Sequence, residues 1–171
     1  VEINDIQIDS RKVKPGFLFV AVKGTTADGH QFIEKAIEKG AAAIICETLP
    51  AGIKENVTYV HVENSATAAG YAAHNFFGKS SEKIRFVGVT GTNGKTTIAT
   101  LLYKLFTRLG YTSGLISTVE NRVGAKVVPA EFTTPDAIQL NRLLAQMVTA
   151  GCTHVFMETS SHALHQYRVT G

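Results

Sequence analysis

The sequence predicts an α/β fold, with a small amino-terminal α/β domain followed by a P-loop-type, mostly parallel α/β domain. Three observations predict it. Short apolar runs typical of strands alternate with segments whose apolar residues recur at helical spacing. The apolar run 85–89 passes through a glycine-containing turn into a helical segment, the order found in phosphate-binding loops. A polar stretch at 78–83 separates the two patterns, so we expect domains at 1–82 and 83–171.

The composition is that of a globular protein with a small basic excess. With 171 residues and 44% hydrophobic content, the chain can form an ordinary core. Its 17 Lys and Arg against 14 Asp and Glu are scattered, which favours small anionic ligands over nucleic acid. We expect a cytoplasmic protein without membrane insertion, because no apolar run is of spanning length and no signal-like segment follows Val1. Cys46 and Cys152 are expected to be reduced, packed thiols.

The first domain is expected to alternate strands with helices. Gly40 stands where a helix commonly ends, and Asn64 can cap the helix that follows it. His61 and His74 have no partners at ligand spacing and are expected to be structural. The polar loop 23–29 has hydroxyls and backbone N–H groups that could hold a phosphate or a sugar, although an ordinary loop fits as well. The expected strands are 1–9, 17–22, 41–46 and 59–62, and the expected helices are 30–39 and the segment after 64.

The second domain is expected to continue the same alternation. A helix from about 95 to 109 should face inward with Ile98, Leu101, Leu102, Leu105 and Phe106. The run 111–117 is expected to be the adjacent parallel strand, and 119–132 a small hairpin around Gly124 that reaches over the site. Thr134 is expected to cap the next helix, with Pro135 in its first position. That helix should bury Ile138, Leu140, Leu143, Leu144, Met147 and Val148 and end at Gly151.

The turn after 85–89 has the residue types of a phosphate loop. Its glycines let backbone N–H groups converge on phosphate oxygens, Lys95 can reach the β- and γ-phosphates, and the Thr96 hydroxyl can ligate Mg²⁺. The following helix adds the positive end of its dipole. Val89 stands where the strict pattern has its first glycine, so a glycine-rich turn with a solvated lysine is the alternative. The expected ATP-binding residues are Gly91, Thr92, Asn93, Gly94, Lys95, Thr96 and Thr97.

An acidic residue ends the last expected strand, 154–157. Because ligands gather at the carboxyl ends of strands in open α/β sheets, Glu158 should lie near the phosphate loop and bind Mg²⁺. The alternative is that Glu158 caps the following helix. The adjacent Ser161 and His162 do not indicate a hydrolase, because neither an oriented acid nor a nucleophile elbow accompanies them.

Several separate motifs resemble one family, the Mur ligases, which are ATP-dependent amide-forming enzymes of peptidoglycan synthesis. Within it the chain is similar to the UDP-N-acetylmuramoyl-tripeptide synthetases, the MurE branch. A MurF-like ligase is the alternative within the family, and a noncatalytic P-loop nucleotide-binding module is the alternative outside it. The motifs are Asp9-Ser10-Arg11, the segment 15–21, Ala27-Asp28-Gly29-His30, the segment 91–97, Thr133-Thr134-Pro135-Asp136, and the segment 157–164 with Gln166 and Arg168.

The resemblance implies roles for residues outside the phosphate loop. Lys95, Thr96 and Glu158 would be catalytic, with Thr96 and Glu158 holding Mg²⁺. The substrates would be UDP-N-acetylmuramoyl-dipeptide and a diamino acid, with ATP and Mg²⁺ as cofactors. The uridine diphosphate end would be held by Ser10, Thr25, Thr26 and Ala27, and the muramoyl-peptide side by Thr133, Thr134, Ser160, Gln166 and Arg168.

The resemblance also implies an ADP-forming ligation through an acyl phosphate. The family's central domain continues beyond the equivalent of Gly171 and is followed by a carboxy-terminal domain that binds the amino acid. The chain is therefore expected to be an amino-terminal fragment, monomeric and inactive in ligation by itself.

Overall fold

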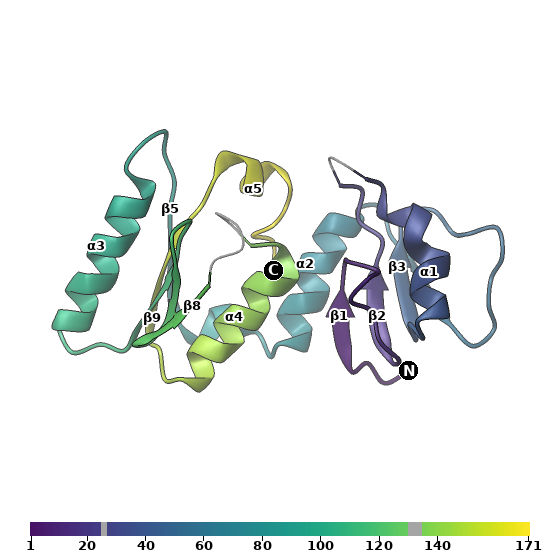
Figure 1. Cartoon of the computed structure of the whole chain (residues 1–171), viewed down its shortest axis with the longest axis horizontal. Helices are drawn as coiled ribbons and strands as arrows, with labels where there is room; N and C mark the ends of the chain where they lie inside the picture. Colours follow the sequence, from purple (N-terminus) through teal and green to yellow (C-terminus); the bar gives the residue numbers. More distant parts are fainter. Residues whose placement is uncertain (25–26, 130–134) are drawn as a thin grey trace. The chain divides into compact units, whose positions relative to one another are not determined.

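The computed structural model describes residues 1–24, 27–129 and 135–171. Contacts divide the chain into two compact units, Val1–Ala73 together with the terminal Gly171, and His74–Thr170. The division falls within helix α2 (Ser65–Phe76), whereas the sequence predicts a boundary at 82/83, after the 3-10 helix η2 (Ser80–Lys83). Each unit has its own sheet (Figure 1).

The first unit contains a four-stranded parallel sheet in the order β1-β2-β3-β4. The four expected strands are confirmed. The first three are shorter than expected, as β1 (Asp5–Gln7), β2 (Phe17–Val20) and β3 (Ala43–Cys46), and the fourth, β4 (Thr58–His61), begins one residue earlier. Residues of β2 and β3 pack against α1 (Ile33–Glu38), where Phe19, Ile44 and Ala36 are fully buried. This unit therefore has an α/β core of its own.

The helix expected at 30–39 begins differently. Gly29–Phe32 forms the 3-10 helix η1 before α1, and the Asp28 side chain accepts a hydrogen bond from the His30 N–H at 3.0 Å. Gly40 has a φ of +89°, which explains why a glycine follows α1. Asn64 caps α2 as expected, because its Oδ1 accepts from the Thr67 N–H at 2.8 Å.

The second unit contains a five-stranded sheet in the order β5-β9-β6-β7-β8. Its strands are β5 (Arg85–Val89), β6 (Ser113–Ile116), β7 (Asn121–Val123), β8 (Lys126–Val128) and β9 (His154–Glu158). Strands β5, β9 and β6 are parallel, and β7 and β8 form the expected hairpin at Gly124. That hairpin pairs with β6 and extends the sheet, so the expectation that it reaches over the site is wrong.

The expectation that 111–117 lies next to the phosphate-loop strand is also wrong. Strand β9 lies between β5 and β6, in parallel register with both. All five residues of β9 are buried, whereas β5 is partly exposed. A strand buried on both faces belongs in the interior of a parallel sheet, which fits the central place of β9.

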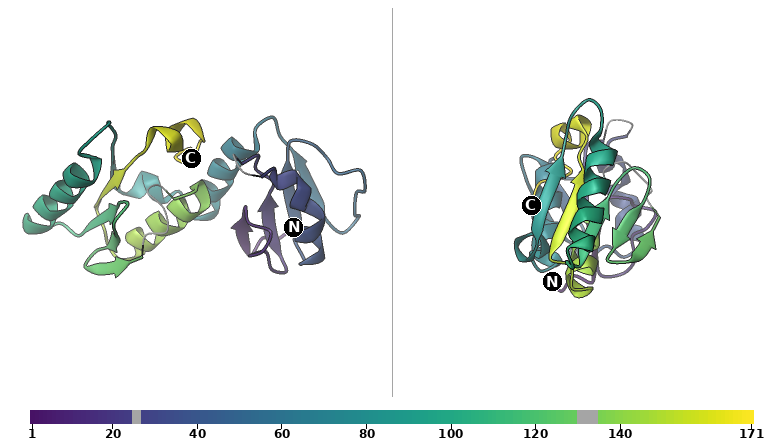
Figure 2. Two further views of the ribbon diagram at one scale, coloured as in Figure 1. Left: turned by 45° about the horizontal axis from the view of Figure 1, so that its top comes forward. Right: turned by 90° about the vertical axis from the view of Figure 1, so that its left-hand side faces the viewer.

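Two helices cover opposite faces of this sheet (Figure 2). Alternate residues of β9 contact different helices, because successive side chains of a strand point to opposite faces of the sheet. Val155 and Met157 pack toward α4 (Ala137–Thr149), and Phe156 packs toward α3 (Lys95–Arg108). The expected burial of Ile138, Leu140, Leu143, Leu144 and Met147 on α4 is confirmed, while Val148 is only partly buried.

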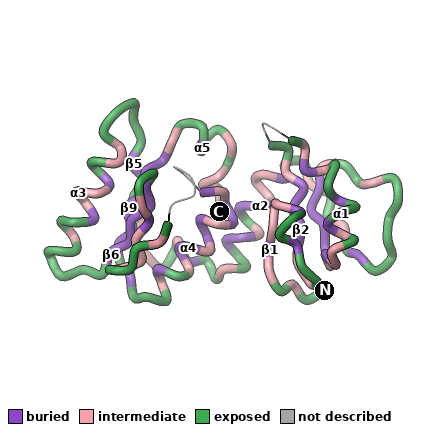
Figure 3. The backbone as a smooth tube through the Cα atoms, in the orientation of Figure 1, coloured by how far each residue is buried: buried purple, intermediate pink, exposed green. Residues whose placement is uncertain are grey.

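The predicted inward face of α3 is partly wrong. Ala99 and Tyr103 are buried against the sheet with Leu102 and Phe106 partly buried beside them. Ile98, Leu101 and Leu105 are instead 49%, 59% and 50% exposed, and they form a second apolar stripe. Figure 3 shows exposed stretches along α3 in green. The helix is apolar on two sides, so periodicity alone could not show which side packs on the strands.

The start of α4 also differs from the prediction. Asp136 is the cap, and its Oδ1 accepts from the N–H groups of Ile138 at 2.9 Å and Gln139 at 2.8 Å. Pro135 therefore precedes the cap and is not in the first helical position. Thr134, the expected cap, lies outside the described residues.

The two cysteines and the two isolated histidines are in structural surroundings. Cys46 and Cys152 are buried free thiols, as expected, and burial raises the pKa of each. The His61 ring pairs with the Glu47 carbonyl at 3.0 Å, and the His74 ring lies 3.3 Å from the Glu82 carboxylate.

Candidate functional site

The phosphate-loop segment is shaped by two glycines. Gly91 has a φ of +149° and Gly94, the residue before α3, has a φ of +80°, conformations that side chains other than glycine rarely adopt. Helix α3 begins at Lys95, so its first N–H groups have no partner within the helix and face the loop end. This arrangement is typical of an anion site at a helix N-terminus.

Lys95 lies against this loop. Its Nζ donates to the carbonyl oxygens of Gly91 at 2.8 Å and Thr92 at 3.3 Å. The ammonium group is thus held beside the turn rather than extended into solvent. An anion bound by the loop would find the positive charge already in place.

The Glu158 carboxylate lies beside the first turn of α3. Val89 at the end of β5 is in register with Glu158 at the end of β9, so both chain segments leave the sheet at the same edge. Glu158 is only 4% exposed, and its Oε2 accepts a hydrogen bond from the Thr96 Oγ1 at 2.9 Å. The expected neighbourhood of Glu158 and the phosphate loop is therefore confirmed. The alternative is wrong, because Ser160 caps the following helix α5 (Ser161–His165).

Thr118 contributes two more hydrogen bonds that the sequence analysis missed. Its N–H at 3.1 Å and its Oγ1 at 2.8 Å both donate to the Glu158 Oε2. Thr118 follows β6, which pairs with β9, so it reaches the same edge of the sheet. The position of Thr118 just after an expected strand was the only sequence feature that could have indicated this role. It was not sufficient, because the sequence does not show that β6 and β9 are neighbours.

These contacts keep Glu158 ionised. Burial raises the pKa of Glu158, but the hydrogen bonds from Thr118 and Thr96 and the nearby Lys95 charge outweigh burial, so the net pKa lies below its usual value. A carboxylate and hydroxyl groups are the oxygen ligands that Mg²⁺ prefers. Within 1–24, 27–129 and 135–171 no three His, Cys, Asp or Glu side chains are placed to hold a metal ion together. The donors fit an Mg²⁺ that is shared with bound phosphates.

The residues expected to bind the sugar-peptide substrate lie in both units. Ser10 follows β1 and is buried, and Ala27 is in the loop that follows β2. Near α5, the Ser160 hydroxyl accepts from the Ala163 N–H at 3.1 Å, Gln166 ends the helix, and the Arg168 N–H donates to the Ala163 carbonyl at 3.0 Å. Substrate binding by these residues stays a prediction. Four others, Thr25, Thr26, Thr133 and Thr134, lie outside the described residues.

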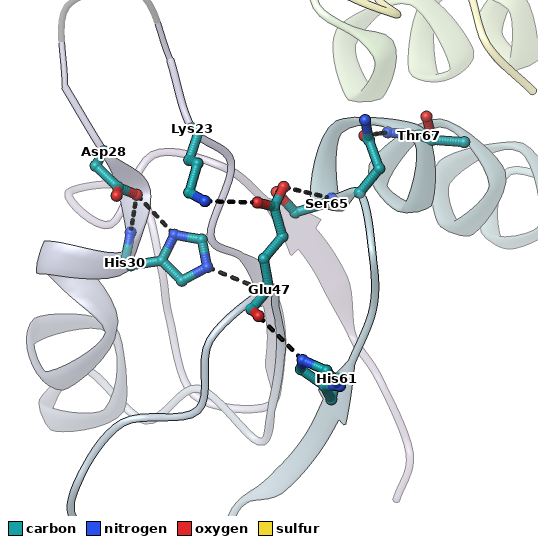
Figure 4. Close-up of polar contacts among 8 residues, drawn as sticks. Lys23, Asp28, His30, Glu47, His61, Ser65 and Thr67 are labelled. Atoms are coloured by element: carbon teal, nitrogen blue, oxygen red, sulfur yellow. Dashed lines mark hydrogen bonds and ion pairs between the residues drawn. The ribbon is translucent and has the colours of Figure 1, made fainter.

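A polar cluster lies at the carboxyl ends of β2, β3 and β4 in the first unit (Figure 4). At its centre, Glu47 forms an ion pair with Lys23 at 2.9 Å. Its other oxygen accepts from the N–H and hydroxyl of Ser65 at 2.9 and 2.8 Å. The pKa of Glu47 is lowered from 4.5 to about 2, mainly by the hydrogen bond from the Ser65 N–H. Burial acts in the opposite direction, and Lys23 lowers the pKa further.

This shift predicts an acid-dependent loss of stability. Because the folded-state pKa is the lower one, the contribution of Glu47 is complete above about pH 4.5 and is lost as the pH falls toward 2. By linkage the contribution is about 3 kcal/mol at most. Denaturant unfolding of the wild type and Glu47→Gln at pH 6 and pH 3 should show a stability difference that shrinks at pH 3. An equal difference at both pH values would contradict this prediction.

Comparisons with known proteins cover nearly the whole chain. Residues 2–77 match the family described as "Mur ligase family, catalytic domain", and residues 89–171 match the "Mur ligase middle domain". The UDP-N-acetylmuramoyl-L-alanyl-D-glutamate--2,6-diaminopimelate ligases of Bacteroides fragilis and Cytophaga hutchinsonii are each 56% identical over the full chain. The chain spans about a third of the length of these relatives, 35% in both cases.

Solved structures give the same result. A structure of a UDP-N-acetylmuramoyl-L-alanyl-D-glutamate--2,6-diaminopimelate ligase matches 99% of this chain and 34% of its own, with a TM-score of 0.82 and 30% identity. The MurF ligase of Thermotoga maritima in complex with ADP matches 92% of this chain and 32% of its own, with a TM-score of 0.60 and 28% identity.

In residues 1–24, 27–129 and 135–171 no helix has both the length and the apolar character needed to cross a membrane.

The comparisons agree on one family. Its two domain models match residues 2–77 and 89–171, the relatives are 56% identical, and the fold is shared with a solved ligase structure. The chain belongs to the Mur ligase family.

Proposed function

We propose that the chain is the amino-terminal part of an ATP-dependent, ADP-forming ligase that adds a diamino acid to UDP-N-acetylmuramoyl-L-alanyl-D-glutamate. The observation that carries this proposal is the 2.9 Å contact between Thr96, at the start of α3, and Glu158, at the end of β9. The names of the two relatives at 56% identity include 2,6-diaminopimelate. The related MurF structure is a complex with ADP, which supports nucleotide binding by this chain.

The proposed reaction has two steps. A substrate carboxylate attacks the γ-phosphorus of ATP, which releases ADP and forms an acyl phosphate. The amino group of the diamino acid then attacks the acyl carbon, and inorganic phosphate leaves as the amide forms. Such chemistry depends on neutralising charge more than on acid–base catalysis.

The residues at the edge of the second sheet would provide that neutralisation. Lys95 and the loop N–H groups would stabilise the transferring phosphoryl group. Thr96 and Glu158 would hold Mg²⁺, which when bound offsets charge on the phosphate oxygens. The guanidinium of Arg168 suits a phosphate or carboxylate of the sugar-peptide substrate, because it can donate two parallel hydrogen bonds.

We propose that this chain does not catalyse ligation alone. Its relatives are about three times longer, and the apolar stripe of α3 at Ile98, Leu101 and Leu105 has exposed fractions of about one half. This stripe is consistent with a further layer of the middle domain packing on α3. The cytoplasmic location and the monomeric state also stay predictions.

Phosphate release tests this proposal. The assay contains ATP, Mg²⁺, UDP-N-acetylmuramoyl-L-alanyl-D-glutamate and 2,6-diaminopimelate. The chain alone should release no phosphate above background, whereas a protein extended to the length of its relatives should turn over. Turnover by the chain alone would overturn its proposed inactivity, and an extended protein indifferent to the UDP-sugar would overturn the proposed substrate.

A further inference from the structure

The described residues on either side of positions 25 and 26 are held by backbone hydrogen bonds. The Gly29 N–H donates to the Val22 carbonyl at 2.9 Å, and the Gly24 N–H donates to the Ala27 carbonyl at 3.0 Å. A Cβ on Gly29 would stand 2.7 Å from the Val22 backbone N and O. The backbone approach at this point therefore requires a glycine, and it holds the start of η1 against Val22, just after β2.

Glu47 braces one flank of the loop. It directly follows β3, and its two carboxylate oxygens are divided between two elements. One oxygen pairs with Lys23, the first residue of the loop, at 2.9 Å. The other accepts two hydrogen bonds from Ser65, the first residue of α2. The side chain thus ties the loop to the helix start, and it is only 18% exposed.

His30 braces the other flank, again through Glu47. The His30 Nε2 accepts from the Glu47 backbone N–H at 2.9 Å, so Nδ1 carries the ring proton and donates to the Asp28 carboxylate at 2.6 Å. Asp28 is near the end of the loop. Both flanks therefore depend on one residue, through its carboxylate on one side and its backbone on the other (Figure 4).

We propose that Glu47 is a positioning residue for the UDP-sugar substrate, holding Lys23 directly and Asp28 through His30 at the carboxyl edge of the first sheet. The inference rests on the proposed function, in which this loop receives the uridine diphosphate end. Glu47 does not itself contact the ligand. A carboxylate near a diphosphate would repel it, so its presence at this edge is explained by what it holds in place.

The sign of one mutational effect tests this inference. Glu47→Gln keeps an acceptor for Ser65 but removes the charge that holds Lys23. If charge alone mattered, removing a negative group would tighten binding of the anionic substrate. A positioning role predicts the opposite, a dissociation constant raised about tenfold, the typical effect of losing a charge-assisted contact. The probe is UDP-N-acetylmuramoyl-L-alanyl-D-glutamate, titrated into the chain by calorimetry, with ATP titrated in parallel.

A second set of variants shows whether the two residues act together. Lys23→Met should weaken binding of the UDP-sugar as Glu47→Gln does. The dissociation constant of the double variant should not exceed that of the single variant with the larger dissociation constant. Lys23→Arg, which can form the ion pair again, should recover most of the affinity lost in Lys23→Met. Lys35→Met is the matched control, because Lys35 is exposed on α1 and its replacement changes the net charge equally. ATP affinity should stay unchanged throughout. Because ATP binding reports on the second unit, circular dichroism and thermal unfolding are recorded for each variant to show that the first unit is still folded at the temperature of the titration.

Each outcome decides a different question. If the wild-type chain does not bind the UDP-sugar, the proposed function of this loop fails and the inference fails with it. If the wild type binds and Glu47→Gln binds as well or better, only the positioning role is overturned. Additive losses in the double variant would also overturn it, because Lys23 would then act on the ligand without Glu47.

Discussion

Replacing Glu158 by Gln in the full-length enzyme that we propose should lower ATP-dependent turnover by at least about 100-fold. Glutamine has nearly the same size and can still accept hydrogen bonds from Thr96 and Thr118, so the change mainly removes a negative charge. That charge is held at neutral pH by the same hydrogen bonds that lower the pKa of the carboxyl group. Its loss should weaken Mg²⁺ binding, and steady-state phosphate release at several Mg²⁺ concentrations measures it.

The matched control for this variant is Glu120→Gln. Glu120 is an acid of the same unit whose side chain pairs with Arg122 at 2.6 Å and is 31% exposed. Its replacement should leave turnover within about twofold, since surface ion pairs contribute little. Equal turnover in Glu158→Gln and wild type at limiting Mg²⁺ would contradict the assigned role of Glu158.

Lys95→Met should reduce turnover by about 100-fold and weaken ATP binding, because it removes the positive charge from the phosphate loop. Methionine keeps a similar unbranched stem. The contacts it loses, to the carbonyls of Gly91 and Thr92, are exposed to water, so the cost in folding stability should be small. Turnover assays and ATP titrations, with thermal unfolding recorded for each sample, separate the two effects.

Lys104→Met provides the control on the same helix, because Lys104 is an exposed residue of α3. It changes the net charge equally and leaves the loop intact. If Lys104→Met weakens ATP binding as much as Lys95→Met, the effect belongs to the overall charge of α3, and the specific role of Lys95 is wrong.

The parts of the site that depend on one strand end and one turn could be predicted from local sequence patterns. The pattern of 85–97 predicted strand, turn and helix, and the acid after 154–157 had to leave the sheet at the edge where ligands gather. The contact between Thr96 and Glu158 follows from those two local patterns. Thr118 was missed because its role depends on β6 pairing with β9, which is a fact of strand order.

Other features depend on choices between similar local patterns. On α3, Ala99 packs against the sheet although Ile98, Leu101 and Leu105 are larger and more apolar, because a small residue lets the helix approach the strands. At α4, Thr134 and Asp136 are both good caps, and the chain uses Asp136. In the first unit, Glu47 follows a strand without any motif. Its contacts with Lys23 and Ser65 join residues that are far apart in the sequence.

The measurement that most directly tests the central claim is the affinity of this chain for ATP with and without Mg²⁺, by calorimetry, in the wild type, Thr96→Ala and Glu158→Gln. The account predicts that Mg²⁺ strengthens ATP binding to the wild type by about tenfold or more and that both variants lose most of this gain. A gain of the same size in all three proteins would contradict the claim that Thr96 and Glu158 jointly hold the metal ion of a bound nucleotide.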